Sequence, residues 1–102
     1  MEDKIGKFVI VRCQRAGVHA GVLVSVSDRS VSLKDSRRLW QWRVPMGAPS
    51  FLSGVAMHGI DHANSKVGTP VDIDLTEAYE VITCSQAAES SIRSAPEVLR
   101  VR

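Results

Sequence analysis

The sequence predicts a small α+β domain in which an antiparallel β-sheet meander carries two short helices. The first half alternates short runs of β-branched and aromatic residues with polar turns, as antiparallel strands do. The second half contains two segments with helix-start and helix-stop signals. With 102 residues, of which 44% are hydrophobic, the chain has the length and apolar content of one domain. We therefore expect a single domain over residues 1–102, and its small size favours symmetric oligomers.

Four strands are expected in the first half, at residues 7–13, 22–26, 30–34 and 37–43. Gly17 and Gly21 lie between the first two strands, where the simplest interpretation makes both of them turn residues. Polar triplets at residues 27–29 and 34–36 separate the other strands. Short polar connections of this kind predict that neighbouring strands pair antiparallel.

A first helix is expected from Phe51 to about His58, with Ser50 as its N-cap and Gly59 as its C-terminal stop. Its buried face should carry the residues at positions i, i+3 and i+4. These residues are Leu52, Val55 and Ala56.

The remaining segments are a loop at residues 61–70, strands at 71–75 and 79–84, and a final helix. Thr83 and Gln86 have the spacing of a capping box, which predicts a helix over residues 85–94. Pro96 ends that helix, and we expect the tail at 97–102 to be mobile. Asp72 and Asp74 alternate with apolar residues and are most simply the solvated face of an edge strand.

Composition and charge exclude several classes of protein. Thirteen Lys and Arg oppose eleven Asp and Glu, and the resulting net charge of +2 is too small to predict nucleic-acid binding. No apolar stretch approaches the roughly 20 residues that a membrane span needs. The charged N-terminus is followed by no apolar signal core, so secretion is not expected. Without export, Cys13 and Cys84 are expected to be free thiols.

The most informative local pattern lies at residues 37–43. In a strand, Arg38, Trp40 and Trp42 share one face, whereas Arg37 points to the other. An Arg beside a Trp can stack on it, and the same pair can hold a nucleotide by its base and its phosphate. Composition and spacing alone favour a simpler interpretation, in which both tryptophans belong to the core and Arg38 covers them.

Other candidate sites have weaker signatures. His58 and His62 have the i, i+4 spacing of two metal ligands, but Gly59 is expected to end the helix between them, so solvent-exposed or ligand-facing histidines are favoured. Cys13 and His19 could form a thiolate pair, although a buried Cys is more often a small hydrophobic residue. The sequence contains no glycine-rich phosphate loop.

Five blocks of the sequence, taken in order, resemble one family of phage counter-defence proteins. They lie at residues 8–12, 16–21, 31–42, 51–59 and 75–92. The two most specific blocks are Ala16-Gly17-Val18-His19-Ala20-Gly21 and Arg37-Arg38-Leu39-Trp40-Gln41-Trp42. Together they resemble the Thoeris anti-defence protein 1 family, over about residues 7–96.

This resemblance implies a sponge for an immune signal and not an enzyme. Bacterial TIR-domain sensors respond to phage by making glycocyclic ADP-ribose from NAD, and this signal activates a killing effector. Family members bind cyclic ADP-ribose isomers between two chains without cleaving them, in the host bacterial cytoplasm during infection. They pair as dimers and can form hexamers as trimers of dimers. Some also bind cyclic di- or trinucleotides of the CBASS defence system at separate sites. No cofactor, no metal, no membrane and no DNA or RNA is implied.

The resemblance also implies two sets of binding residues. The set for the cyclic ADP-ribose signal offers cations, amides and flat apolar surfaces: Arg38, Trp40, Phe51, Met57, His58, Asn64 and Lys66. In this set Arg38 would bind phosphate, whereas Phe51 and Met57 would pack on the base. The set for the cyclic oligonucleotide comprises Arg12, Gly17 and His19.

Three other functions stay open at the level of sequence. A small β-rich nucleic-acid-binding module would bind DNA or RNA in a salt-dependent manner. An enzyme that degrades the same signal would need an acid–base pair or a metal near the ligand. An interaction protein without a ligand would lose stability, and no binding activity, when Arg38 and Phe51 are replaced by Ala.

Overall fold

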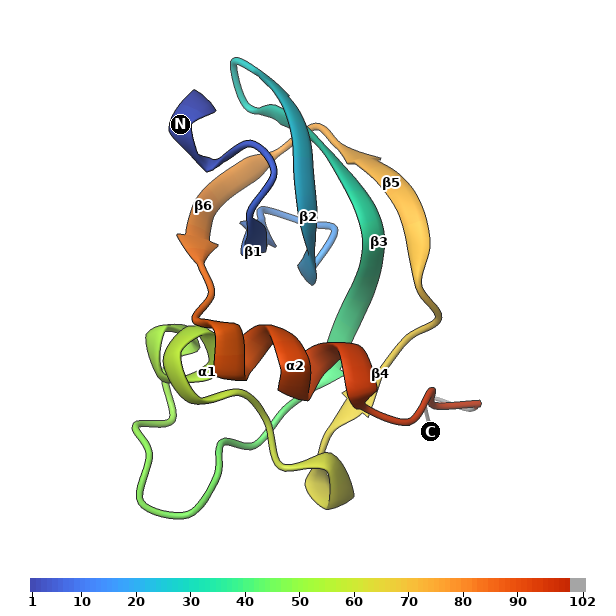
Figure 1. Ribbon diagram of the computed structural model, residues 1–102. Coiled ribbons are helices and arrows are strands. Elements are labelled where there is room, and N and C mark those ends of the chain that lie inside the picture. The colour runs from blue at the N-terminus through green and yellow to red at the C-terminus, as the bar shows by residue number, and fades with distance from the viewer. Residues whose placement is uncertain (100–102) are drawn as a thin grey trace.

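The computed structural model describes residues 1–99, and within them the chain forms six strands and two α-helices (Figure 1). The strands are β1 (Phe8–Cys13), β2 (Val18–Ser27), β3 (Ser30–Gln41), β4 (Lys66–Val67), β5 (Val71–Leu75) and β6 (Ala78–Thr83). The helices are α1 (Leu52–His58) and α2 (Gln86–Ser94), with short 3₁₀ turns η1 (Glu2–Lys4) and η2 (His62–Asn64). All strand pairs are antiparallel, which confirms the predicted α+β class.

The sheet is strongly curled. Its order is β4-β3-β2-β1-β6, and β5 pairs with β3, so β5 and β6 lie at opposite edges. Only Thr76 and Glu77 separate these two strands in the chain. Three Cα–Cα steps span at most about 11 Å, so the two edges must approach each other at this end. Figure 1 shows β6 and β5 on opposite sides of the curved sheet, joined across the top.

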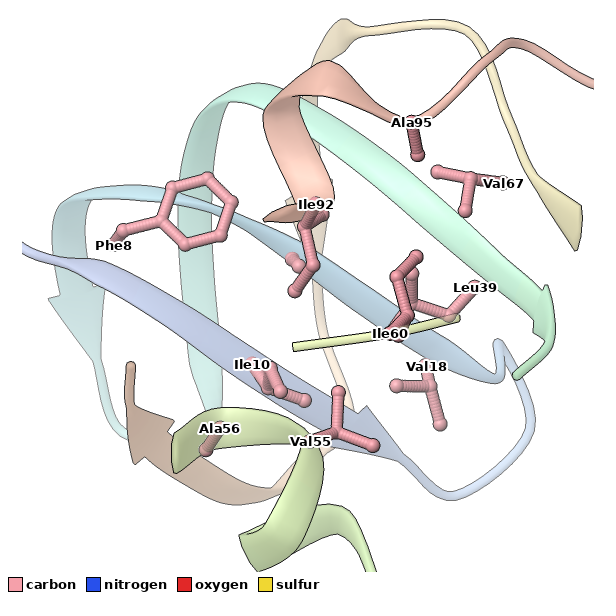
Figure 2. Close-up of a cluster of buried hydrophobic side chains, with 11 residues drawn as sticks. Phe8, Ile10, Val18, Leu39, Val55, Ala56, Ile60, Val67, Ile92 and Ala95 are labelled. Carbon is pink, nitrogen blue, oxygen red and sulfur yellow. The ribbon is translucent and has the colours of Figure 1, made fainter. Parts of the chain in front are cut away.

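Each face of the sheet carries its own apolar cluster. We call the face toward the inside of the curl the inner face; its cluster contains Val9, Val11, Cys13, Leu23, Val31, Leu33 and Leu75. The opposite face, which we call the helix face, is covered by α1 and α2 (Figure 2). There Val55 and Ala56 of α1 pack with Ile10 of β1 and Ile92 of α2, and all four are at most 1% exposed. The buried face predicted for the first helix is thereby confirmed, with Leu52 at its partly buried edge.

The predicted turn at residues 34–36 is wrong. β3 runs without interruption from Ser30 to Gln41, so the two strands expected at 30–34 and 37–43 are one. Asp35 has a φ of 53°, and the pairing of β3 with both neighbours shifts in register around it. Asp is one of the few residues that adopt this left-handed conformation readily. The polar triplet therefore makes a bulge inside a strand and not a chain reversal.

Gly17 and Gly21 have different structural roles, although the sequence predicts a turn position for both. Gly17 has a φ of 86° and lies in the β1–β2 turn, as predicted. Gly21 is inside β2, which begins at Val18 and not at residue 22. A Cβ atom on Gly21 would lie 2.8 Å from the Cα atom of Ser36, so this glycine is needed because two strands approach closely.

Both helices begin one residue later than predicted. α1 has Phe51 at its N-cap, so Ser50 does not cap it, and Gly59 ends it with a φ of 82° as expected. α2 is capped by Ser85, whose side chain accepts a hydrogen bond from the Ala88 amide, so the capping box of Thr83 and Gln86 is not formed.

Two further expectations need correction. Part of the predicted 61–70 loop is ordered, because β4 pairs with the end of β3. Val67 of β4 also bridges Glu97 and accepts a hydrogen bond from the Val98 amide, so the first residues of the expected mobile tail are held in place. The rest of that expectation, at residues 100–102, lies outside the described residues. None of the helices within residues 1–99 has the length and hydropathy to cross a membrane.

Candidate functional site

An exposed arginine–tryptophan stack lies at the end of β3. Arg38 and Trp40 project from the same face of the strand, and the guanidinium carbon of Arg38 lies 3.7 Å from the centre of the Trp40 ring. Trp40 is 44% exposed, so the interpretation that assigned both tryptophans to the core is wrong for this residue. Trp42 lies beyond the strand and is partly buried against the helix-face cluster. The stack provides a guanidinium and a flat apolar surface side by side.

Arg38 keeps its charge available for an anion. Ion pairs engage Arg12, Arg15 and Arg93 with carboxylates, but within residues 1–99 no carboxylate lies within ion-pair distance of Arg38. Arg38 is half-buried, and the Trp40 ring orients its guanidinium. A cation that is already oriented loses less conformational entropy when it binds a phosphate.

Gly17 and His19 border this stack. A Cβ atom on Gly17 would lie 2.9 Å from Nη2 of Arg38, so a larger residue would displace the guanidinium from its present position, and the φ of 86° itself favours glycine. His19 is the direct partner of Arg38 in the β2–β3 register and is 5% exposed. Its Nε2 lies 2.8 Å from the carbonyl oxygen of Ala16, so this nitrogen donates the hydrogen bond. Burial lowers the pKa of His19, and the charge of Arg38 lowers it slightly further. The hydrogen bond to Ala16 acts in the opposite direction but is the weaker effect, so the neutral ring is favoured.

Arg37 points the other way, as predicted, and is buried at 4% exposure. Its guanidinium donates hydrogen bonds to the carbonyl oxygens of Gly68, Ile92 and Ala95, at 2.6 to 2.9 Å. A longer contact of 3.3 Å reaches the carbonyl oxygen of Arg93. These carbonyls include the last ones of α2, where the helix dipole favours a positive charge. Arg37 therefore fixes α2 against β3, and it also fixes the rotation of β3 that turns Arg38 outward.

A hollow of about 260 Å³ lies on the helix face beside the start of α1. Its lining residues are Arg12, Phe51, Leu52, Ser53, Glu80 and Ile82. Phe51 is 75% exposed, and Arg12 forms an ion pair of 3.1 Å with Glu80 across the β1–β6 register. Glu80 and Ser53 are not among the predicted site residues. The alternation of Glu80 and Ile82 in β6 places both on one face, but only the topology brings that face to Phe51.

The structure regroups the predicted binding residues. Arg38 lies opposite His19 and Val11, which belong to the inner-face side of the sheet. Arg12 lies opposite Val18, which belongs to the helix-face cluster. The inner-face group therefore combines Arg38 and Trp40 with Gly17 and His19, whereas Arg12 joins Phe51 on the helix face. Within one chain the stack and the hollow lie on opposite faces of the sheet.

The other predicted ligand residues surround α1 and η2. Met57 is 57% exposed, and His58 is exposed at the end of α1. Asn64 is exposed and donates a hydrogen bond of 2.8 Å to Oδ2 of Asp61. Lys66 is half-buried in β4, opposite Gln41 of β3. Among the described residues, no hydrogen bond or stack joins the side chains of Met57, His58 or Asn64 to the Arg38–Trp40 stack.

The histidine pair is divided by the end of α1, and both cysteines are free thiols. Gly59 ends α1 before His62, whose Nε2 lies 2.7 Å from the carbonyl oxygen of Ser91. Residues 1–99 contain no group of three His, Cys, Asp or Glu side chains placed to hold a metal ion. Cys13 and Cys84 are free. Burial raises the pKa of Cys13, and that of Cys84 to about 12, so both thiols stay protonated near neutral pH.

A larger hollow of about 490 Å³ lies along β2, β3 and β5. Asp72 and Asp74 line it and are exposed, as expected for the solvated face of an edge strand. The Asp72 carboxylate accepts a hydrogen bond from the Asp35 amide, and the Asp74 carboxylate accepts one from the Ser32 hydroxyl. Both carboxylates therefore have a role in joining β5 to β3, and we do not assign a ligand to this hollow.

Comparison with known proteins gives one match. No curated protein and no solved structure is similar enough to match the chain. A family model matches residues 6–92, which include every strand, α1, and α2 as far as Ile92. The chain therefore belongs to the family described as "Domain of unknown function (DUF6948)".

Proposed function

We propose that the protein binds and sequesters a cyclic ADP-ribose immune signal without cleaving it. One observation carries this proposal: the half-buried Arg38 is stacked on an exposed tryptophan and has no carboxylate partner within residues 1–99. Such a guanidinium binds a pyrophosphate, and such a ring offers a stacking surface to an adenine. The resemblance of residues 7–96 to the Thoeris anti-defence protein 1 family supports the same ligand. In this role the protein acts in the cytoplasm of an infected bacterium.

The arrangement of the two faces supports a site shared between copies. Phe51 and Arg38 were both expected to bind the signal, yet they lie on opposite faces of one chain. A ligand that contacts both therefore lies between two chains, with the stack of one chain facing the hollow of another. We propose a homodimer for this reason, and a hexamer of three dimers as its higher assembly. Binding of cyclic oligonucleotides is then an additional activity of the hexamer.

The experiment is a retention assay. The purified protein is mixed with glycocyclic ADP-ribose, free ligand is removed, and the protein is denatured by heat. Mass spectrometry of the supernatant should detect the intact ligand only after heating. Arg38→Ala and Trp40→Ala should each reduce the retained ligand at least tenfold, because each removes one of the two recognition elements.

Two matched controls separate binding from general damage. Arg15→Ala removes another exposed arginine, one that is paired with Glu77 at 3.1 Å. Tyr79→Ala removes another exposed aromatic ring, since Tyr79 is 56% exposed. Both variants should retain the ligand fully. A chemically converted ligand would indicate an enzyme, and salt-dependent binding of DNA or RNA in place of the signal would indicate a nucleic-acid-binding module; either result refutes the proposal.

A further inference from the structure

The hollow beside α1 contains an oriented carboxylate. Arg12 and Glu80 are direct partners in the β1–β6 register, so the backbone of two paired strands places them side by side. Nε of Arg12 lies 3.1 Å from Oε1 of Glu80, and both side chains are about half exposed, at 51% and 49%. A carboxylate has about four lone-pair sites, and this ion pair uses one. Glu80 therefore keeps acceptor capacity toward the hollow.

The rest of the hollow is suited to a flat ring. Leu52 and Ile82 line it and pack against the helix-face cluster, so this part of the surface is apolar and supported from below. The Phe51 ring is 75% exposed at the rim, and Ser53 adds a hydroxyl group. The volume of about 260 Å³ is below the range of about 300–1,000 Å³ for sites that enclose a whole drug-sized ligand. The hollow therefore fits a part of a nucleotide and not a complete dinucleotide.

The charges in the hollow determine which part of a nucleotide it can bind. The Arg12–Glu80 pair has no net charge, and a phosphate placed against Glu80 would be repelled by it. A neutral group that donates hydrogen bonds is favoured instead. The vicinal hydroxyl groups of a ribose are such donors, and acidic side chains bind them in nucleotide sites of other folds.

We propose that this hollow binds the ribonucleoside part of the ligand and that Glu80 selects ribose over deoxyribose. Phe51 stacks on the base, Glu80 accepts a hydrogen bond from the ribose hydroxyl group that the ring closure of the signal leaves free, and Arg12 is a positioning residue that holds the carboxylate. This inference rests on the proposed function, because it assigns a sugar-recognition element to the same signal-binding protein.

The test uses adenosine and 2′,3′-dideoxyadenosine as probes, since neither carries a phosphate. Each is titrated at millimolar concentration into the ¹⁵N-labelled protein and followed by NMR. Adenosine should shift the amide signals of Ser53, Glu80 and Ile82, and its Kd should be about tenfold lower than that of the dideoxy compound, because it makes hydrogen bonds to a charged acceptor. Phe51→Ala should weaken both probes alike.

Variants of Glu80 decide whether this side chain is responsible. Glu80→Ala should reduce the difference between the two probes to less than twofold, whereas Glu77→Ala, which removes another ion-paired carboxylate, should leave it unchanged. Glu80→Gln keeps the size of the side chain and should give an intermediate difference. Dispersed amide spectra of all variants show that they are folded.

Three outcomes overturn the inference: equal affinity for the two probes, discrimination that survives Glu80→Ala, or no shift at the hollow. The retention assay distinguishes these from a failure of the proposed function. If the cyclic ADP-ribose signal is retained but adenosine shifts no amide signals at the hollow, only the proposed sugar recognition is refuted. If adenosine is discriminated through Glu80 and the signal is not retained, the proposed ligand is refuted and the ribonucleoside site stands.

Discussion

Replacing Arg37 by Met should destabilise the protein more than any other single arginine substitution. The apolar side chain has a similar length, but it removes the guanidinium donor from the carbonyl groups of Gly68, Ile92 and Ala95. The Ile92 carbonyl keeps the Ala95 amide, 3.3 Å away, as a second donor. A hydrogen bond from a charged donor contributes about 1.5–3 kcal/mol to stability, and Met offsets part of this loss because it also removes the cost of burying the guanidinium. The groups left behind are neutral carbonyls, which cost about 1–3 kcal/mol each when they are buried without a donor, so we expect a net loss of about 3 kcal/mol.

That loss is large for a domain of this size. Stabilities of about 5–15 kcal/mol are typical, and 1 kcal/mol corresponds to about 4–8 °C in Tm for a domain of this length. The expected decrease in Tm is therefore about 12–24 °C. Urea unfolding followed by tryptophan fluorescence measures the free energy directly, with Trp42 as a probe that packs against the core.

Two comparisons make the measurement specific. Arg37→Lys keeps a positive charge but loses the fork of donors, so it should cost about half as much. Arg43→Met makes the same chemical change at an exposed arginine and should alter the free energy by less than about 0.5 kcal/mol. If Arg37→Met costs no more than Arg43→Met, Arg37 does not hold α2 against β3, and its hydrogen bonds contribute no net stability.

Three other predictions concern the strands around the stack. Gly17→Ala places a Cβ atom 2.9 Å from Nη2 of Arg38 at a φ of 86°, so it should cost about 1–3 kcal/mol and change the near-UV circular dichroism of the tryptophans; an unchanged spectrum and Tm would contradict the close approach. The pKa of His19 is lowered in the folded protein by burial, so the unfolded chain binds its proton more tightly. Stability should therefore decrease as the pH falls below about 6.5 and level off below the folded-state pKa; urea unfolding at several pH values measures this slope, and His19→Gln should remove it. The Ser36 hydroxyl is buried and makes no hydrogen bond to any group within residues 1–99, so Ser36→Ala should be neutral or stabilising by up to about 1 kcal/mol; thermal unfolding that shows a clear loss would reveal a partner for this hydroxyl.

The strands and helices were largely predictable because their signals are local. Runs of β-branched and aromatic residues identified β1 and β6, and alternation identified β5, each to within about two residues, and Gly59 marked the end of α1. The start of each helix was less predictable, because Ser, Thr and Phe at neighbouring positions compete for the N-cap, and tertiary packing decides among them. β4 could not be predicted, since two residues carry no period and the strand exists only through its pairing with β3.

The candidate site was predictable in part. The i, i+2 spacing of Arg38 and Trp40 correctly indicated that the two side chains meet. The exposure of Trp40 was not predicted, because a large apolar residue in a strand is usually buried. The hollow could not be predicted either: Arg12, Phe51 and Glu80 are far apart in the sequence, and only the pairing of β6 with β1 brings them together.

The bulge in β3 explains why the stack and the hollow lie on opposite faces. Before the bulge, Val31 and Leu33 point to the inner face; after it, Leu39 points to the helix face, although all three positions have odd numbers. One inserted residue, Asp35, therefore exchanges the two faces of the strand, because side chains alternate with a period of two. Without this exchange of faces, Arg37 would point to the inner face, away from the carbonyl groups at the end of α2. The bulge thus turns Arg37 toward the helices and, as a direct consequence, turns Arg38 and Trp40 to the face where no helix covers them.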